Sequence, residues 1–66
     1  MINRLKIERA IKNLTQDDLA KLIGVSRQTI NSIETGRYVP STILALKISK
    51  VFEKQVNQIF ELEDSD

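Results

Sequence analysis

The hydrophobic residues of this chain recur at helical spacing in a series of short stretches. Apolar positions three or four residues apart mark one face of an amphipathic helix. The first such stretch predicts a helix from Asn3 to about Asn13. Its apolar residues are Leu5, Ile7, Ala10, Ile11 and Leu14.

The stretch TQDDLAKLIG carries signals for both ends of a second, two-turn helix. Thr15 and Asp18 have the spacing of a capping box, in which the threonine hydroxyl accepts a hydrogen bond from the amide three residues later. Gly24 can take the left-handed conformation that ends a helix. The predicted buried stripe of this helix is Leu19, Ala20, Leu22 and Ile23.

A third helix is predicted from Arg27 to about Thr35. Ser26 is a good N-cap for this helix, and Gly36 can end it. The connection to the second helix is so short that the two helices must cross steeply, as in a helix-turn-helix. This two-helix unit spans about residues 16–35.

The rest of the chain predicts two more helices. Ser41 or Thr42 can cap a fourth helix that runs to about Phe52. Its expected buried residues are Leu44, Ala45, Ile48, Val51 and Phe52. The apolar residues of the last short helix are Val56, Ile59 and Phe60. For the end FELED two alternatives stay open: an edge strand paired with the MIN start, or a frayed terminus.

Composition limits what such a chain can do. At 66 residues it has room for a single domain, residues 1–66, with a small core. It contains no cysteine and no histidine, so disulfides, the common zinc-ligand sets and the usual catalytic groups are missing. We therefore predict neither an enzyme nor a metal or cofactor site. Because MINRLKIERA is no signal peptide and no apolar run approaches the roughly 18 residues of a membrane helix, we expect a soluble, cytoplasmic protein.

Charge is unevenly distributed along the chain. The net charge is +1, but the acidic C-terminal tail, residues 61–66, holds four of the nine acidic residues. Residues 1–60 are therefore a basic body, which suits a polyanionic partner. A solvated surface with a solubilising tail explains the charge equally well.

The outward face of the third helix carries candidate base-reading side chains. At 100° per residue, one side of the helix holds Ile30, Ile33 and Glu34. The opposite side holds Gln28, Ser32 and Thr35, flanked by Thr29 and Asn31. In a DNA major groove, glutamine can pair with adenine, arginine with guanine, and serine or threonine with several bases. For an isolated helix, a merely solvated face is the simpler interpretation.

Neighbouring residues favour nucleic-acid binding over a merely solvated face. Gln16 opens the second helix, where free amides and the positive end of the helix dipole can hold a phosphate. Arg37 and Tyr38 directly follow the third helix, and both can donate to a phosphate. Gathered around one exposed helix, these groups predict an interface with double-stranded DNA.

The stretch LTQDDLAKLIGVSRQTINSIETGRYVPS resembles the helix-turn-helix family of the Cro and phage-repressor type, also called the xenobiotic-response-element type. The elements T-Q-x-x-L-A, G-V-S and I-E-x-G carry the resemblance, which weaker helix positions extend from Asn3 to Phe60. It implies an all-α, five-helix domain like that of lambda repressor, whose third helix enters the major groove. Arg9 and Glu34 match a pair that forms a partly buried structural salt bridge in this family.

The resemblance also implies which residues contact DNA. The leading base-reading residue is Gln28, with Arg27, Thr29 and Ser32 beside it. The implied backbone contacts are Gln16, Ser26, Asn31, Arg37, Tyr38 and Ser41.

Two positions depart from the family pattern. Glu8 stands where relatives usually carry an apolar residue, and it can instead pair on the surface with Arg4 and Lys12. Val39 stands where Asn or Asp often precedes the proline. A polar backbone contact is therefore missing there, or an apolar contact replaces it.

Together with these patterns, the resemblance implies a transcriptional regulator, which we expect to be a repressor that binds an inverted repeat as a homodimer. One helix reads few bases, and two half-sites about one helical turn apart double the readout. The candidate dimer-interface residues are Leu44, Phe52, Val56, Ile59, Phe60 and Leu62. The alternative is an antitoxin-like or other protein-interaction module, whose main partner would be a protein.

Overall fold

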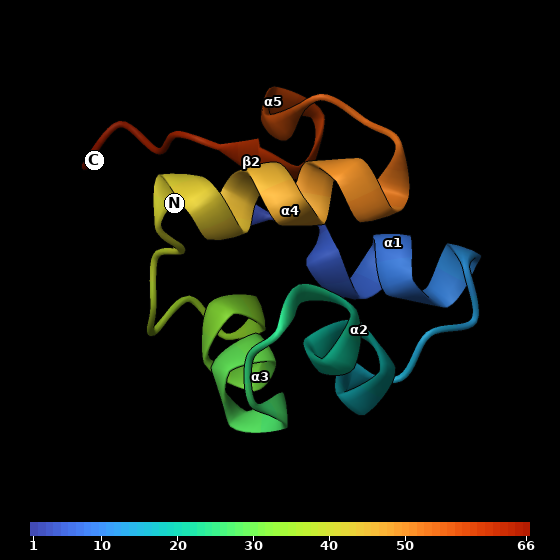
Figure 1. The fold of residues 1–66 in the computed structure, drawn as a ribbon. Helices are drawn as coiled ribbons and strands as arrows, with labels where there is room; N and C mark the ends of the chain where they lie inside the picture. The colour runs from blue at the N-terminus through green and yellow to red at the C-terminus, as the bar shows by residue number, and fades with distance from the viewer.

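Five helices and one two-stranded ribbon make up the fold (Figure 1). The computed structural model describes residues 1–66. The elements in chain order are β1 (Ile2–Asn3), α1 (Leu5–Ile11), α2 (Gln16–Ile23), α3 (Arg27–Glu34), α4 (Thr42–Phe52), α5 (Val56–Ile59) and β2 (Phe60–Glu61). The predicted five-helix architecture is therefore confirmed. Its longest helix, α4, has 11 residues, and no helix has the length and hydropathy needed to cross a membrane.

Side-chain caps begin three helices where the sequence predicts them. The Thr15 hydroxyl accepts from the Asp18 amide at 3.0 Å, and the Asp18 carboxylate accepts from the Thr15 amide at 2.9 Å. Ser26 accepts from the Thr29 amide at 3.1 Å and begins α3. Ser41, the first of two candidates, caps α4. These caps satisfy amides that the first turn of a helix leaves without a partner.

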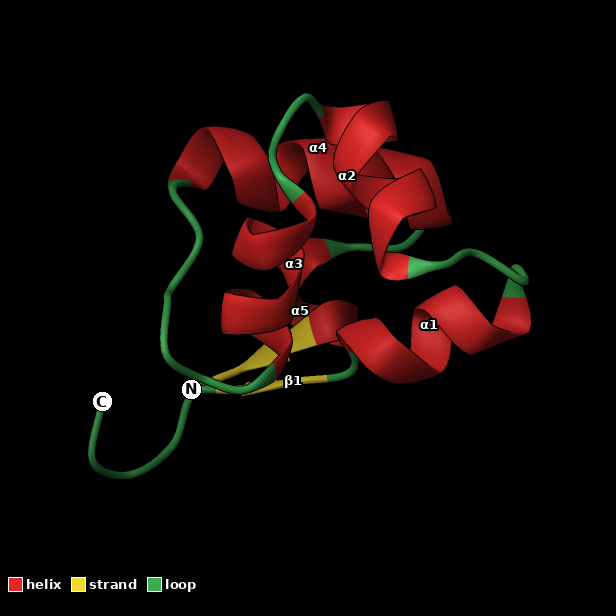
Figure 2. Cartoon of the chain, turned by 90° about the horizontal axis from the view of Figure 1, so that it is seen from below, coloured by secondary structure: helices red, strands yellow, loops and turns green.

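The two ends of the chain pair as a short antiparallel ribbon, so the alternative of a frayed FELED end is wrong for β2. Ile2 lies opposite Glu61, and Asn3 lies opposite Phe60. Figure 2 shows the two strands side by side, next to α5. The Asn3 side-chain amide also donates to the carbonyl of Ile33 at 2.9 Å. This hydrogen bond ties the ribbon to the end of α3.

α1 is shorter than predicted and buries a different face. It has seven residues, because Asn3 belongs to β1 and Asn13 has a left-handed φ of 56°. Leu5 is buried, whereas Ile7 and Ile11 are 49% and 65% exposed. At about 100° per residue, Ile7 lies nearly opposite Leu5, so a single helix face cannot include both. The prediction that Ile7 and Ile11 share one apolar helix face with Leu5 is therefore wrong.

Glu8 is buried inside the domain, and the predicted surface pairing with Arg4 and Lys12 is wrong. α1 turns Glu8 inward together with Leu5, and Glu8 is only 3% exposed. Its Oε2 atom lies 2.9 Å from Nζ of Lys54, in the connection between α4 and α5. A buried charge is costly unless it is paired. The charge of Lys54 therefore offsets the cost of burying the Glu8 carboxylate.

The core draws on all five helices and β2. Its buried apolar residues are Leu5, Leu19, Ala20, Ile23, Ile30, Ile33, Ile48, Phe52, Ile59 and Phe60. The half-buried apolar residues at its margin are Met1, Leu14, Val25, Leu44, Ala45, Val51 and Val56. Leu22 is exposed, so its predicted burial is wrong: it lies at the edge of the stripe that α2 buries. Three of the six candidate interface residues, Phe52, Ile59 and Phe60, are thus core residues, and among the six only Leu62, at 78%, is largely exposed.

Candidate nucleic-acid interface

α3 lies on the core with its apolar side inward and its polar side outward. Ile30 and Ile33 are buried, and α3 packs closely against α2. Gly24 ends α2 with a φ of +77°, a conformation that residues with a Cβ rarely adopt. Figure 1 shows α2 and α3 together at one end of the molecule, below α4. The outer side of α3 therefore faces solvent.

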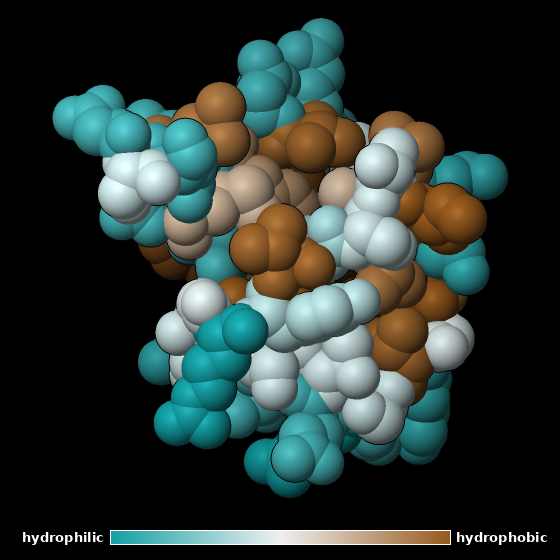
Figure 3. Space-filling model, turned by 90° about the vertical axis from the view of Figure 1, so that its left-hand side faces the viewer, coloured by the Kyte–Doolittle hydropathy of each residue, from teal (hydrophilic) through white to brown (hydrophobic).

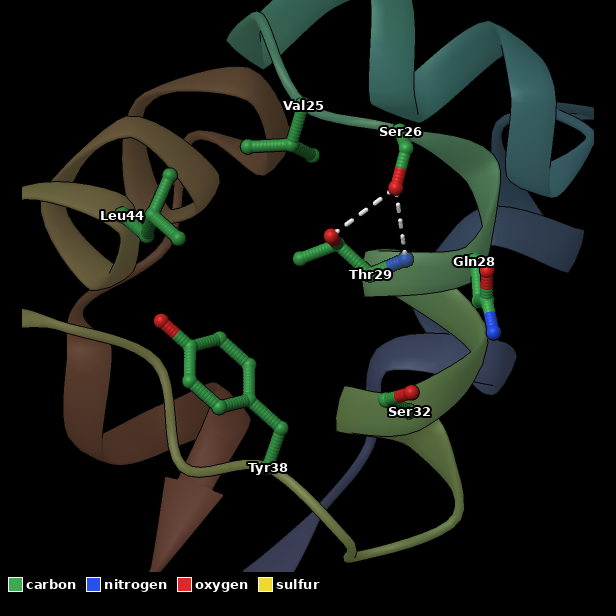
Figure 4. A pocket seen from close by; sticks show the side chains of 7 residues that line it. All are labelled: Val25, Ser26, Gln28, Thr29, Ser32, Tyr38 and Leu44. Atoms are coloured by element: carbon green, nitrogen blue, oxygen red, sulfur yellow. Dashed lines mark hydrogen bonds between the residues drawn. The ribbon is translucent and has the colours of Figure 1, made fainter.

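Two hollows flank α3, and Gln28 borders both of them. The first hollow is lined by Arg27, Gln28 and Asn31. The second hollow lies between α3 and the start of α4 (Figure 4), and its lining residues are Val25, Ser26, Gln28, Thr29, Ser32, Tyr38 and Leu44. Gln28 is exposed and stands on the ridge between the two hollows.

The start of α2 is hydrogen-bonded to the middle and end of α3. The Gln16 side-chain amide donates to Asn31 Oδ1 and to Glu34 Oε1, both at 3.1 Å. Two of the residues that the resemblance assigns to the DNA backbone, Gln16 and Asn31, are thus brought together at one edge of α3.

Glu34 is the only acidic residue of α3, and it is turned toward α1. The Arg9 Nε atom lies 2.5 Å from Glu34 Oε2, and Arg9 Nη2 donates to Glu34 Oε1 at 3.1 Å. Arg9 also donates to the carbonyl of Leu14 at 2.8 Å. The side chains of Arg9 and Glu34 are only 13% and 7% exposed. The salt bridge that the resemblance implies is therefore present, and it joins α1 to α3.

The surroundings of Glu34 keep its carboxyl group ionised. Burial alone raises the pKa of Glu34, but hydrogen bonds from Arg9 and Gln16 outweigh burial and hold this pKa below its ordinary value. The hydrogen bond to Glu34 in turn raises the pKa of Arg9. Because Arg9 balances the charge of Glu34, this acid does not oppose an anionic ligand on the outer side of α3.

The loop after α3 folds back onto the end of that helix. The backbone amides of Arg37 and Tyr38 both donate to the carbonyl of Ser32, at 2.9 and 3.2 Å. The Tyr38 ring thereby borders the second hollow, where Figure 4 shows its hydroxyl directed toward Leu44. Arg37 is exposed, while the Ser41 hydroxyl is occupied by its cap on α4. Arg37 and Tyr38 therefore lie beside the end of α3, whereas Ser41 begins α4.

Two of the hydroxyl groups assigned to DNA are bonded to each other. The Ser26 and Thr29 side-chain oxygens lie 3.0 Å apart, and Thr29 is half-buried. Arg27 and Gln28, in contrast, are exposed. The hydroxyl of Thr29 is therefore less available to a base than the polar groups of Arg27 and Gln28.

Two apolar residues of this site are missing from the predicted contact residues. Val25 and Leu44 line the second hollow, one from the turn before α3 and one from α4. The pattern of residues within one helix cannot reveal lining residues that belong to two other segments. The shortness of the turn around Val25 was the only local signal for its place beside α3.

A two-helix unit with a short connection, whose second helix presents arginine, glutamine and hydroxyl groups to solvent, is typical of a helix-turn-helix DNA-binding domain. The helix-turn-helix family model matches residues 5–59. The chain belongs to this family, of the Cro and phage-repressor type, and is a DNA-binding transcriptional regulator.

Relatives that match over the whole chain carry the same description. An uncharacterized HTH-type transcriptional regulator of Methanocaldococcus jannaschii is 56% identical over 66 residues, which is 100% of both chains. The uncharacterized HTH-type transcriptional regulator YgzD of Bacillus subtilis is 44% identical over 66 residues, again 100% of both chains. The similarity therefore includes the elements on either side of the two-helix unit.

Two solved structures share the fold. The restriction-modification controller protein C.AhdI of Aeromonas hydrophila has a TM-score of 0.78 at 30% identity, covering 86% of both chains. The SOS-response transcriptional repressor LexA of Eubacterium rectale has a TM-score of 0.80 at 27% identity, over 94% of this chain and 66% of its own. The predicted lambda-repressor-like fold is therefore confirmed.

Proposed function

We propose that this chain is a transcriptional repressor that binds an inverted-repeat operator as a homodimer, with α3 of each copy in the major groove. The observation that carries the proposal is the exposed ridge of α3, where Gln28 stands between two hollows. Two copies related by a two-fold axis would read half-sites about one helical turn, ~34–36 Å, apart. The repressor assignment is supported by the Eubacterium rectale neighbour, which is a transcriptional repressor. We assign the chain no catalytic role and no cofactor.

Gln28 is the leading base-reading residue in this proposal. Its amide can pair bidentately with an adenine, and Arg27 at the start of α3 can pair with a guanine. Ser32 lies one turn after Gln28, borders the same hollow and can bond to several bases. These contacts would make binding depend on sequence.

A second set of side chains would hold the DNA backbone on both sides of α3. Gln16 and Asn31 meet at one edge of the helix, and Arg37 and Tyr38 follow its end, with Tyr38 bordering the opposite hollow. The remaining members of this set, at the starts of two helices, are Ser26 and Ser41. Phosphate contacts fix the register and orientation of a protein on the duplex. They would therefore keep Gln28 aimed at the base edges.

The homodimer would use the apolar surface beside the start of α4. A hollow of this surface is lined by Met1, Val39, Pro40, Thr42, Ala45, Leu46, Val56 and Phe60. Val39 and Leu46 are more than half exposed. Figure 3 shows the face on which α3 and the start of α4 lie. Apolar side chains, in brown, gather in its upper part and along its right-hand edge. Burial of exposed apolar surface favours association, which supports a dimer contact here.

The same surface supports the alternative function, a protein-interaction module such as an antitoxin. A different protein could cover the hollow around Val39 and Leu46 in place of a second copy. Co-purification of one stoichiometric partner, with no preference for any DNA sequence, would favour this alternative over the repressor.

Alanine at Gln28 and alanine at Arg37 are expected to affect DNA binding differently. Gln28→Ala removes a base contact, so it should weaken binding to a specific duplex by ~1–3 kcal/mol and leave binding to a scrambled duplex unchanged. Arg37→Ala removes a phosphate contact, so it should weaken binding to both duplexes alike and reduce the salt dependence. Fluorescence anisotropy with the two labelled duplexes measures both effects.

Asn57→Ala is the matched control for these variants. Asn57 is an exposed amide residue on α5, outside the α3 surface, so its replacement should leave both affinities unchanged. Thermal unfolding of each variant shows whether a loss of binding comes from a loss of folded protein. Equal losses on both duplexes for a folded Gln28→Ala protein would overturn the base-reading assignment.

A further inference from the structure

A hollow between α2 and α4 combines apolar walls with two lysines. Its lining residues are Leu22, Ile23, Lys47, Lys50 and Val51. Leu22 is 60% exposed and Val51 is half-buried, so apolar surface is open to solvent there. Both lysines are exposed, neither makes an ion pair, and no acidic residue lines the hollow. This α2–α4 hollow shares no residue with the two hollows beside α3 or with the hollow of the proposed dimer surface.

The C-terminal tail, residues 61–66, carries the opposite charge and an exposed leucine. Leu62 is 78% exposed. Two of the four acidic residues of the tail pair with the amino group of Met1. The other two, Glu61 and Asp64, make no ion pair. The tail therefore offers unpaired carboxylates on either side of one exposed leucine in the sequence.

The tail and the α2–α4 hollow match each other in charge and in hydropathy. We propose that the tail of one copy docks in this hollow of a second copy. Leu62 contacts Leu22 and Val51, and the unpaired carboxylates of the tail lie beside Lys47 and Lys50. Opposite charges select the partner, and burial of the exposed leucine favours association. A DNA phosphate has no apolar group and would leave Leu22 and Val51 in water, so the tail is the better match.

Within one copy, the tail and the hollow lie apart. Figures 1 and 2 both show the C-terminus projecting away from α2, which forms one wall of the hollow. The pairing of β2 with β1 and the two ion pairs to Met1 hold the tail on that side. Because two different surfaces meet, the contact is head-to-tail and can link homodimers in series. Linked homodimers would bind adjacent operators cooperatively, a consequence that rests on the proposed function, whereas the contact itself needs no DNA.

Charge exchange between the tail and the hollow tests the contact. Sedimentation velocity of the full chain over a concentration series measures association beyond the homodimer. Lys50→Glu is expected to weaken this association about threefold, and so are Glu61→Lys and Asp64→Lys, because each change removes an attraction. Lys50 is reversed in preference to Lys47, whose Nζ lies 3.5 Å from the carbonyl of Ile23 in its own domain. Lys50→Glu combined with at least one of the two tail reversals should restore association, because opposite charges again face each other.

Lys12→Glu is the matched control for the charge exchange. Lys12 is an exposed lysine at the end of α1, outside the hollow, so its reversal changes the net charge equally and should leave association unchanged. Leu62→Ala is expected to weaken association about tenfold, because it removes buried carbon groups. Ile11→Ala, which truncates an aliphatic residue that is 65% exposed on α1, should have no effect. Circular dichroism shows whether each variant is folded.

Three results would overturn the proposal while the proposed function stands. In the first, the protein stays dimeric at every concentration. In the second, Lys50→Glu and Lys12→Glu have equal effects, which means that net charge and not the hollow controls association. In the third, Lys50→Glu lowers the affinity for all DNA and leaves association unchanged, which assigns the hollow to DNA phosphates. A protein that stays monomeric at every concentration and on DNA would instead reject the homodimer of the proposed function as well.

Discussion

Replacement of Arg9 by alanine is expected to lower the free energy of unfolding by about 3–5 kcal/mol, because it strands the charge of a buried partner. The Glu34 side chain is 7% exposed and would keep the hydrogen bond from Gln16 at 3.1 Å. The core of so small a domain rarely supplies more than ~3–5 kcal/mol, so the Arg9→Ala protein is expected to be largely unfolded. Urea and thermal unfolding followed by circular dichroism measure the loss.

Two comparison variants separate the effect of burial from that of charge. Lys21→Ala breaks an exposed pair with Asp17, whose charged atoms are 3.1 Å apart, and should cost only ~0.3–0.5 kcal/mol. Replacement of both Arg9 and Glu34 by leucine removes both charges, so it should cost less than Arg9→Ala alone. An Arg9→Ala protein as stable as Lys21→Ala would contradict the structural role of this salt bridge.

Ile30→Ala is expected to cost about 2–5 kcal/mol of unfolding free energy, the range for truncating a buried aliphatic side chain. Ile30 is 0% exposed and anchors α3 to the core. The cavity would loosen the packing of α3 on the core, which keeps Gln28 directed toward solvent. Denaturant unfolding gives the loss of stability, and specific DNA binding should fall with the folded fraction.

Ile11→Ala truncates another isoleucine, at a position where the helical pattern and the structure disagree about contact with the core. The pattern predicts that Ile11 belongs to the apolar face of the first helix, whereas Ile11 is 65% exposed. We therefore expect a change in unfolding free energy within about 0.5 kcal/mol. A loss comparable to that of Ile30→Ala would mean that α1 packs with a different face toward the core.

Helix ends were predictable because their signals involve residues that are neighbours in the chain. Thr15, Ser26 and Ser41 mark helix starts, since each hydroxyl accepts from an amide within the next turn. Gly24 marks a helix end because a left-handed residue needs no distant partner. Both members of each interaction can therefore be read from a short stretch of sequence.

Packing partners that are distant in the chain could not be predicted in this way. Glu8 pairs with Lys54, 46 residues away, whereas local spacing offers only Arg4 and Lys12. The apolar residues of α1 lie on two sides of that helix, and only the position of the other helices decides which side is covered. A helical pattern shows that apolar residues are present without showing what they contact.

The same difference between local and distant partners applies to the candidate site. The outward direction of Gln28 follows from the apolar periodicity on the opposite side of α3, which a single helix contains. The second hollow could not be predicted from that periodicity, because Leu44 and Tyr38 border it from other segments. Nor does residue spacing show that the side-chain hydroxyl groups of Ser26 and Thr29 are hydrogen-bonded to each other.

Selection of random duplex DNA by the purified protein tests most directly whether a pair of α3 helices reads a specific sequence. The selected duplex and a scrambled control are then titrated over a series of salt concentrations. We predict enrichment of an inverted repeat with half-sites about one helical turn apart. Binding to both duplexes should depend steeply on salt, with the selected duplex bound at least ~10³-fold more tightly. Enrichment of no sequence, with equal binding to both duplexes, would contradict base reading by α3.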